Sequence, residues 1–170
     1  MTPKTLKPSG QRLDYMAELV AEAVLGEPLD SPDSMWMGRG TDMEDEARGW
    51  YELTRGVDVD VVGFVVNGGV GCSPDGLVGS DGLVEIKIRK AANHMAAVMA
   101  GVHGALDTQI QGQLMVTERA WCDVIHYNPQ LPSQVVRVER DEDYVGALRA
   151  ALLGFTNELA AALAALALPS

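Results

Sequence analysis

The stretch CSPDGLVGSDGLVEIKIRK, residues 72–90, decides how the rest of the chain is interpreted. Asp75 lies in a Ser-Pro-Asp-Gly turn, and a strand is predicted over residues 83–88. Because side chains alternate across a strand, three aliphatic side chains should face one way, and Glu85 and Lys87 the other. The aliphatic side can pack into a core, whereas the other side presents a carboxylate and an ammonium within reach of Asp75.

Two acids and a lysine that converge on one sheet face are the side chains of a metal-dependent phosphodiesterase. Oxygen ligands that hold Mg²⁺ while leaving waters on it would come from Asp75, Glu85 and the backbone carbonyl of Ile86. Lys87 would orient or deprotonate the attacking water and offset charge on the phosphate. The alternative is a solvated turn aspartate and a Glu/Lys pair on a surface edge strand, because acids and lysines are common.

Further candidates lie on predicted helices. The sequence TDME, residues 41–44, matches a capping box, in which Glu44 satisfies a backbone donor at a helix start. A role in the site requires that helix start to lie near the sheet. Gln109 and Gln113 are four residues apart on a helix predicted over 105–117, so they share a face. They either face solvent or line a groove and contact DNA phosphates or the site acids.

The composition is typical of one globular domain and argues against general affinity for nucleic acid. The chain has 170 residues, 47% of them hydrophobic, and a net charge of −11, whereas duplex binding relies on neutralising phosphates. Cations held by the acids, and a few basic side chains near the site, would permit local contact with DNA. Two cysteines without a CxxC pair, and an N-terminus without an apolar leader, fit a reducing, cytoplasmic setting. The three histidines have no metal-ligand spacing.

The periodicity predicts an α/β domain without repeats or linkers. A capped helix should begin after Asp141 and form a packed helix rather than a membrane span, since charged and amide side chains interrupt it. Residues 57–88 are interpreted as a meander of three or more strands, and residues 89–104 as a mobile loop or loose helix. Other helices are predicted over 11–25 and 41–56, and other strands over 120–127 and 134–140.

Four stretches, in this order, resemble the phage lambda exonuclease and YqaJ-like viral recombinase family of the PD-(D/E)xK nuclease superfamily. They are GTDMEDEARGWYE, GCSPDGLVGSDGLVEIKIRK, TQIQGQLMVTERAWCDVIHYNP and VVRVERDEDY. The resemblance implies a restriction-endonuclease-like α/β core, with a central mixed sheet flanked by helices, as a single domain over residues 1–170. It places Asp75 and Glu85 on metal ligands, Lys87 on the catalytic lysine, Glu44 on the helical active-site glutamate as a further metal ligand, and Gln109 on the glutamine of a QxQ helix.

The resemblance also implies an activity and partners. Family members are Mg²⁺-dependent exonucleases, with Mn²⁺ as a substitute, that degrade linear duplex DNA 5′→3′ and leave 3′ single strands. The implied setting is the cytoplasm of a bacterial host, with a phage or prophage gene. The implied partners are duplex DNA ends, a single-strand annealing protein and further copies in a ring trimer, without a membrane.

One departure keeps other functions open. The family usually has an N-terminal segment, with a tryptophan, an arginine and a Thr-Ala-Ser-type helix start, that helps to hold the 5′ phosphate. The chain is expected to lack this segment, and Ser9 and Arg12 do not replace it. The alternatives are an endonuclease or single-strand nuclease of the same superfamily, and an N-terminally shortened, non-catalytic remnant or partner-binding subunit.

Overall fold

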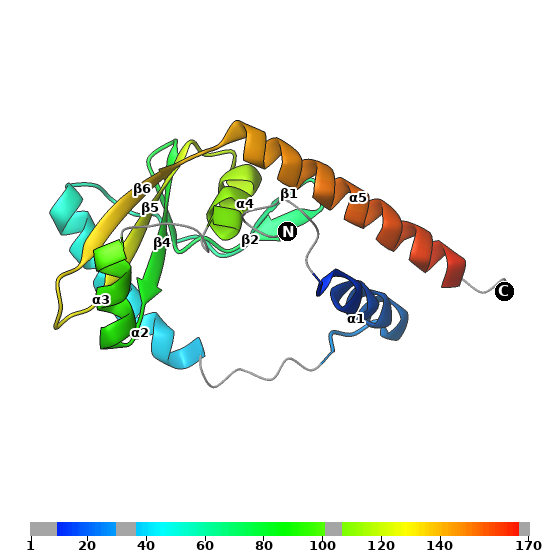
Figure 1. Cartoon of the computed structure of the whole chain (residues 1–170), viewed down its shortest axis with the longest axis horizontal. Helices are drawn as coiled ribbons and strands as arrows, with labels where there is room; N and C mark the ends of the chain where they lie inside the picture. Colours follow the sequence, from blue (N-terminus) through cyan, green and yellow to red (C-terminus); the bar gives the residue numbers. More distant parts are fainter. Residues whose placement is uncertain (1–9, 30–36, 101–106, 167–170) are drawn as a thin grey trace.

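The computed structural model describes residues 10–29, 37–100 and 107–166, and its centre is a four-stranded mixed sheet (Figure 1). β4 and β5 run parallel, while β3 and β6 flank them antiparallel at the two edges. β4 is therefore an inner strand, not the surface edge strand of the alternative interpretation. The strands are β3 (Gly76–Val78), β4 (Gly82–Ile88), β5 (Trp121–Tyr127) and β6 (Gln134–Glu139).

Helices cover both faces of this sheet. α2 (Met37–Arg55) packs Ala47 and Tyr51 against the aliphatic side chains of β4 and β5. α4 (Asp107–Thr117) packs Ile110 and Leu114 against the opposite face. The crossover between the two parallel strands contains α3 (Ala91–Ala100) and α4, as a parallel connection requires. The sheet is thus buried on both sides.

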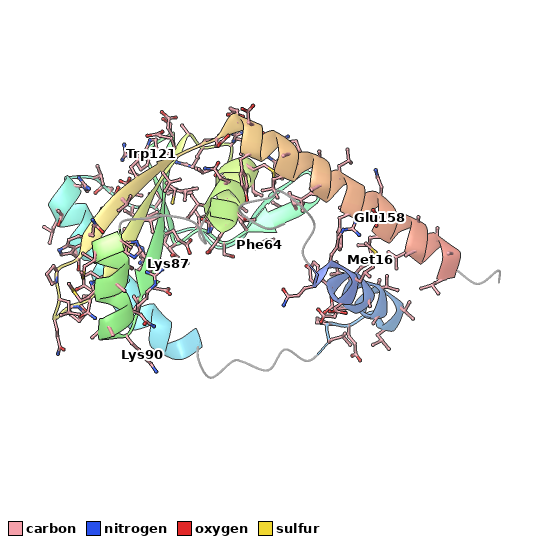
Figure 2. All side chains as sticks on the ribbon, in the orientation of Figure 1. Met16, Phe64, Lys87, Lys90, Trp121 and Glu158 are labelled. Atoms are coloured by element: carbon pink, nitrogen blue, oxygen red, sulfur yellow. The ribbon has the colours of Figure 1, made fainter. Side chains whose placement is uncertain are left out.

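A hairpin and two more helices extend from the sheet. The hairpin consists of β1 (Val65–Asn67) and β2 (Val70–Cys72), and it packs against α4 and the start of α5 (Glu142–Leu166). α1 (Arg12–Leu25) lies along α5, away from the sheet (Figure 1). Arg12 pairs with Glu158 at 2.8 Å, and Met16 and Glu158 lie on the facing sides of the two helices (Figure 2).

The start of α2 corrects the sequence analysis. α2 begins at Met37 rather than Thr41, so residues 41–44 lie inside the helix and the predicted capping box is wrong. Backbone donors inside a helix already bond to the preceding turn and need no side-chain cap. The buried face of α2 contains Ala47 and, one turn later, Tyr51, which is 1% exposed, whereas Leu53 is 88% exposed.

The remaining elements follow the prediction closely. The meander contains β1 to β4, although its first two strands form a sheet of their own. Residues 91–100 form a defined helix rather than a loop, and residues 105 and 106 of the predicted third helix lie outside the described residues. Asp141 caps α5 as expected, since its Oδ1 accepts the Tyr144 N–H at 2.9 Å.

α5 is most deeply buried near its start and is covered only in part further along. Val145 and Leu148 are buried, Leu152, Phe155 and Leu159 are partly buried, and Leu166 near the end of the helix is 54% exposed. Among the described residues, α5 is the one helix long and apolar enough to cross a membrane, with a mean hydropathy of 1.2 over its most apolar window. Such a helix is weak grounds for a membrane span, because core helices share the same composition.

Candidate active site

The alternation of β4 sorts its side chains as the sequence predicts. Val84 and Ile86 are buried on the face that α2 covers. Glu85 and Lys87 point to the face that α4 covers, where Glu85 is only 4% exposed and Lys87 is partly exposed. The carboxylate is therefore a buried acid, and a buried acid needs hydrogen-bond donors or a cation.

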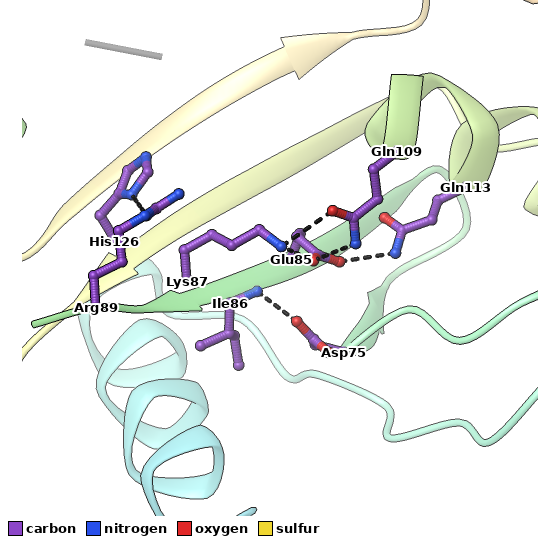
Figure 3. Close-up of polar contacts among 8 residues, drawn as sticks. All are labelled: Asp75, Glu85, Ile86, Lys87, Arg89, Gln109, Gln113 and His126. Carbon is purple, nitrogen blue, oxygen red and sulfur yellow. Dashed lines mark hydrogen bonds and ion pairs between the residues drawn. The ribbon is translucent and has the colours of Figure 1, made fainter. Parts of the chain in front are cut away.

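Three donors surround the carboxylate of Glu85 (Figure 3). Its Oε1 accepts from Lys87 Nζ at 2.5 Å and from Gln109 Nε2 at 2.7 Å. Its Oε2 accepts from Gln113 Nε2 at 2.8 Å. Lys87 also donates to Gln109 Oε1 at 3.1 Å. Of the two alternatives for the glutamines, contact with a site acid is the one that the structure has.

Gln113 was considered together with Gln109 in the sequence analysis, but only Gln109 was assigned a role in the site. Gln113 is 4% exposed, and its amide holds the Glu85 oxygen that Gln109 does not reach. The signal for it was present in the spacing, because residues one helical turn apart reach the same neighbour. Helical spacing alone did not say which of the two faces of α4 meets the sheet.

Asp75 approaches from the turn between β2 and β3. Its Oδ2 accepts the backbone N–H of Ile86 at 2.6 Å, and Arg48 Nη2 donates to its backbone carbonyl at 3.3 Å. Burial, and then the charges of Glu85 and Glu44, raise the pKa of Asp75 to about 6, against its ordinary 3.8. Asp75, Glu85 and Glu44 therefore act on one another as neighbouring negative charges.

Glu44 reaches this cluster from α2. Its side chain is partly exposed, and its charge contributes to the raised pKa of Asp75. The glutamate lies in the interior of the helix rather than in a cap, so its local role does not compete with a role in the site. Glu46, two residues later, instead accepts a hydrogen bond from Tyr127 Oη at 2.8 Å.

The oxygen groups at this position fit a hard divalent cation. The ladder between β3 and β4 stops at Gly76 and Val84, so no bond from β3 reaches the carbonyl of Ile86 on the side where Asp75 lies. The Glu85 carboxylate has about four lone-pair positions and uses three. Within the described part of the chain, no three His, Cys, Asp or Glu side chains form a ready-made cage. Mg²⁺ usually takes one or two carboxylates and completes its shell with water and substrate phosphate, which suits this arrangement.

The amino-acid sequence itself decides the family. Residues 4–120, more than half of the chain, match the model of the YqaJ-like viral recombinase domain. The chain belongs to the YqaJ-like viral recombinase family. The resemblance stated from the four sequence stretches is thereby confirmed. No curated protein matches the chain.

Solved structures agree with this membership of the YqaJ-like family. An alkaline exonuclease from Laribacter hongkongensis, LHK-Exo, is 33% identical with a TM-score of 0.82, over 94% of this chain and 85% of that one. The same enzyme in complex with dAMP gives a TM-score of 0.83 at 33% identity, over 95% and 86% of the two chains. A phage-related exonuclease from Haemophilus somnus 129PT is 14% identical with a TM-score of 0.72, over 98% and 92%, and supports the fold alone.

The comparisons confirm the predicted fold class and explain α5. The protein has the restriction-endonuclease-like α/β fold, a mixed sheet flanked by helices. Because the likeness to LHK-Exo covers 95% of the chain, α5 lies within the shared fold. We therefore interpret α5 as a helix of this fold rather than a membrane span.

Proposed function

We propose that this protein is a metal-dependent exonuclease that acts on linear duplex DNA in a phage-type recombination system. The observation that carries the proposal is the convergence of Asp75, Glu85 and Lys87 at the Ile86 peptide, with Gln109 fixing the glutamate and the lysine. A structural role does not require two acids and a lysine at one buried point. Membership of the YqaJ-like family and the likeness to an exonuclease along most of the chain support the same activity.

In this proposal the residues of β4 and of the turn before β3 have separate roles. Asp75, Glu85, Glu44 and the Ile86 carbonyl would hold Mg²⁺, or Mn²⁺ in its place. The ion, when bound, supplies Lewis-acid polarisation of the phosphodiester and neutralises its charge. Lys87 orients the attacking water and offsets charge on the phosphate. Gln109 and Gln113 keep the carboxylate of Glu85 in one orientation, as outer-shell groups do at metal sites.

The substrate and the polarity are proposed from the family and its neighbours. LHK-Exo is an exonuclease that was crystallised with dAMP, a mononucleotide. A cut that releases mononucleotides from a 5′ end leaves a 3′ single strand, which a single-strand annealing partner can use. The net charge of −11 confines DNA contact to a local surface, because most of the protein repels phosphate.

We also propose that the whole chain, residues 1–170, is one nuclease domain that works as a ring trimer in the bacterial cytoplasm. The exposed apolar side chains of α1 and α5 support assembly, since contiguous exposed apolar surface favours contact between proteins. They include Leu13, Val24, Leu25, Leu153 and Leu166. Sedimentation equilibrium tests the assembly, and a single species at the monomer mass of 18.2 kDa would contradict it.

The decisive experiment is digestion of linear duplex DNA with 5′-phosphate or 5′-hydroxyl ends, in Mg²⁺ and in chelator, beside a closed circular duplex. We expect metal-dependent release of nucleotides from the linear substrates only. Asp75→Ala should abolish the reaction while its far-UV circular dichroism stays unchanged. The matched control is Asp81→Asn, which changes an exposed turn aspartate at the other end of β3.

Each other outcome selects another function. Metal-dependent cutting of the circle as well would indicate an endonuclease of the same superfamily. Cutting by Asp75→Ala at the rate of the parent protein would remove the proposed site. A folded protein that cuts nothing in Mg²⁺ or Mn²⁺ would favour the non-catalytic, partner-binding alternative.

A further inference from the structure

Arg89 continues the row of side chains that begins with Glu85 and Lys87. It follows the last residue of β4, and the strand alternation places it on the face of Lys87. His126 of β5 is paired with Lys87 in the parallel register. Arg89 Nη1 lies 2.6 Å from His126 Nδ1, and Figure 3 shows this contact next to Lys87. A second basic group thus stands one strand repeat beyond the candidate catalytic lysine.

The contact with Arg89 determines which ring nitrogen of His126 carries the proton. A guanidinium only donates hydrogen bonds, so Nδ1 of His126 accepts and its proton is on Nε2. His126 is 2% exposed, and burial, followed by the charge of Arg89, lowers its pKa to about 4. The ring is therefore neutral at neutral pH, and it holds Arg89 without cancelling its charge.

A second buried histidine, His94, lies close enough to His126 to affect its pKa. His94 of α3 is fully buried, and its Nε2–H donates to the carbonyl of Pro132 at 2.8 Å. Within the described residues, His94 Nδ1 and His126 Nε2 are the buried ring nitrogens that lack a partner.

Arg89 keeps its positive charge exposed to the site. No ion pair joins it to a described carboxylate, whereas Arg48, Arg137 and Arg140 each pair with one. One of its five N–H groups is taken by His126, and the side chain is partly exposed. In a chain with a net charge of −11, an arginine held by a neutral acceptor beside the candidate site is suited to bind an anion.

We propose that Arg89 binds a phosphate of the DNA backbone next to the one that is cut, and that His126 positions it. Alternate residues of a strand lie roughly 7 Å apart, comparable to the separation of neighbouring phosphates in one nucleic-acid strand. Lys87 then serves the reacting phosphate and Arg89 the adjacent one. The inference rests on the proposed nuclease function, but DNA binding tests it without cleavage.

The first test compares Arg89→Ala, Arg89→Lys and Arg149→Ala. Arg149 is exposed on α5 and controls for the loss of one positive charge. We expect Arg89→Ala to raise KM on linear duplex about tenfold with kcat changed by less than about threefold, as a charged hydrogen bond to substrate predicts.

DNA binding gives a second readout of the same variants. For Arg89→Ala, the slope of the logarithm of the binding constant against the logarithm of the salt concentration, measured in Ca²⁺, should fall in magnitude by about 1. Arg89→Lys should keep the slope while raising KM, because an ammonium keeps the charge but not the fork. Arg149→Ala should keep KM and the slope of the parent protein.

The second test asks whether His126 acts through Arg89. His126→Leu should raise KM as Arg89→Ala does, and His126→Asn, whose amide oxygen replaces Nδ1 as acceptor, should restore it. The double variant Arg89→Ala/His126→Leu should be no worse than Arg89→Ala alone. If His126→Leu fails to fold, His126→Phe, which keeps a buried ring but offers no acceptor to Arg89, takes its place.

Two results would overturn the inference. One is a parental KM and salt slope in Arg89→Ala, and the other is a loss confined to kcat. Failure of the proposed function is a different observation, namely a parent protein that binds DNA without cutting it. Even then the salt slope of Arg89→Ala would report whether Arg89 contacts a phosphate.

Discussion

Two buried carboxylates lie on neighbouring strands of the same sheet and have opposite surroundings. Glu85 on β4 is 4% exposed, and Asp123 on β5 is 2% exposed. Val84, the residue before Glu85, is paired with Asp123, so the two acids point to opposite faces. The comparison separates a carboxylate that stabilises the fold from one that is arranged for chemistry.

Asp123 is matched by a full positive charge. Arg137 donates to both of its oxygens, at 2.8 and 2.9 Å, and Tyr51 Oη donates at 2.7 Å. Burial opposes its ionisation, but the hydrogen bonds from Arg137 and Tyr51 outweigh burial and lower its pKa. The guanidinium of Arg137 also lies 3.6 Å from the ring of Trp121, at the other end of the sheet from Lys87 (Figure 2). Nothing in this group calls for a further ligand.

The negative charge of Glu85 is neutralised only in part by the groups around it. Two of its three donors are neutral amides, and the third, Lys87, is shared with Gln109. Asp75 stands beside it with a pKa raised to about 6, because burial and the charge of Glu85 both disfavour its ionised form. The difference teaches that burial alone does not mark a site; what marks it is burial with negative charge that the protein does not neutralise.

The strongest way to break the comparison is to neutralise each acid in turn. Glu85→Gln should lower kcat/KM on linear duplex by at least about 10³-fold, because it removes a proposed metal ligand whose loss would cost several kcal/mol in the transition state. Asp123→Asn should keep kcat/KM within about threefold. Steady-state cleavage in Mg²⁺ gives both values, and comparable losses in the two variants would show that the acids are not functionally distinct.

Two glutamines of α4 test the same comparison between Glu85 and the rest of the fold, with smaller expected losses of activity. Gln113→Leu removes a donor to Glu85 and should cost about 10- to 100-fold in activity, as outer-shell groups do at metal sites. Gln111, two residues earlier, instead bonds the backbone of Glu139 and Asp141 at 2.9 Å each. Gln111→Leu is therefore the matched control: it should lower the melting temperature while leaving kcat/KM close to that of the parent protein. The reverse pattern would exchange the roles assigned to the two glutamines.

The sequence predicted the local geometry around Glu85 well. The period of two over residues 83–88 sorted the faces of β4, and the Ser-Pro-Asp-Gly turn placed Asp75 beside them. The spacing of Gln109 and Gln113 showed that they share a face. These inferences succeed because each depends on residues close together in the chain and on the fixed geometry of one element.

Contacts between side chains of distant elements could not be predicted from the sequence. Asp123, Tyr51 and Arg137 come from β5, α2 and β6, and no local pattern says that they meet. The contact of Arg89 with His126 depends likewise on the parallel register of β4 and β5. The capping box at residues 41–44 failed for a related reason, since a matching motif cannot exclude an earlier helix start.

Removal of Asp123 should lower stability rather than activity. Asp123→Ala leaves the buried hydroxyl of Tyr51 without an acceptor, while Arg137, whose side chain is 48% exposed, can turn to water. We expect a loss of about 2 kcal/mol in the free energy of unfolding, measured by urea denaturation in chelator. Tyr51→Phe in the Asp123→Ala background should then cost almost nothing, and additive losses in this cycle would refute the coupling.

The smallest effect distinguishes the two sites by the sign of their pH dependence. The pKa of Asp75 in the folded protein, about 6, exceeds its ordinary 3.8, so between about pH 4 and 6 the folded state binds more protons than the unfolded state. In chelator the free energy of unfolding should therefore fall as the pH rises through this window. Asp75→Asn should remove that fall and be more stable than the parent protein at pH 7. The full shift corresponds to about 3 kcal/mol, and because Asp75 is partly exposed, screening by solvent should reduce the gain to about 1 kcal/mol.

Asp123 should behave in the opposite way, because its pKa is lowered. Its contribution is complete above the ordinary pKa and disappears as the pH falls below it, so the deficit of Asp123→Ala should shrink in acid. Urea titrations of the three proteins at pH 3, 5 and 7 measure both trends. Parallel curves for the parent protein and Asp75→Asn would mean that Asp75 carries no excess repulsion, and the electrostatic argument for a cation at Glu85 would lose its support.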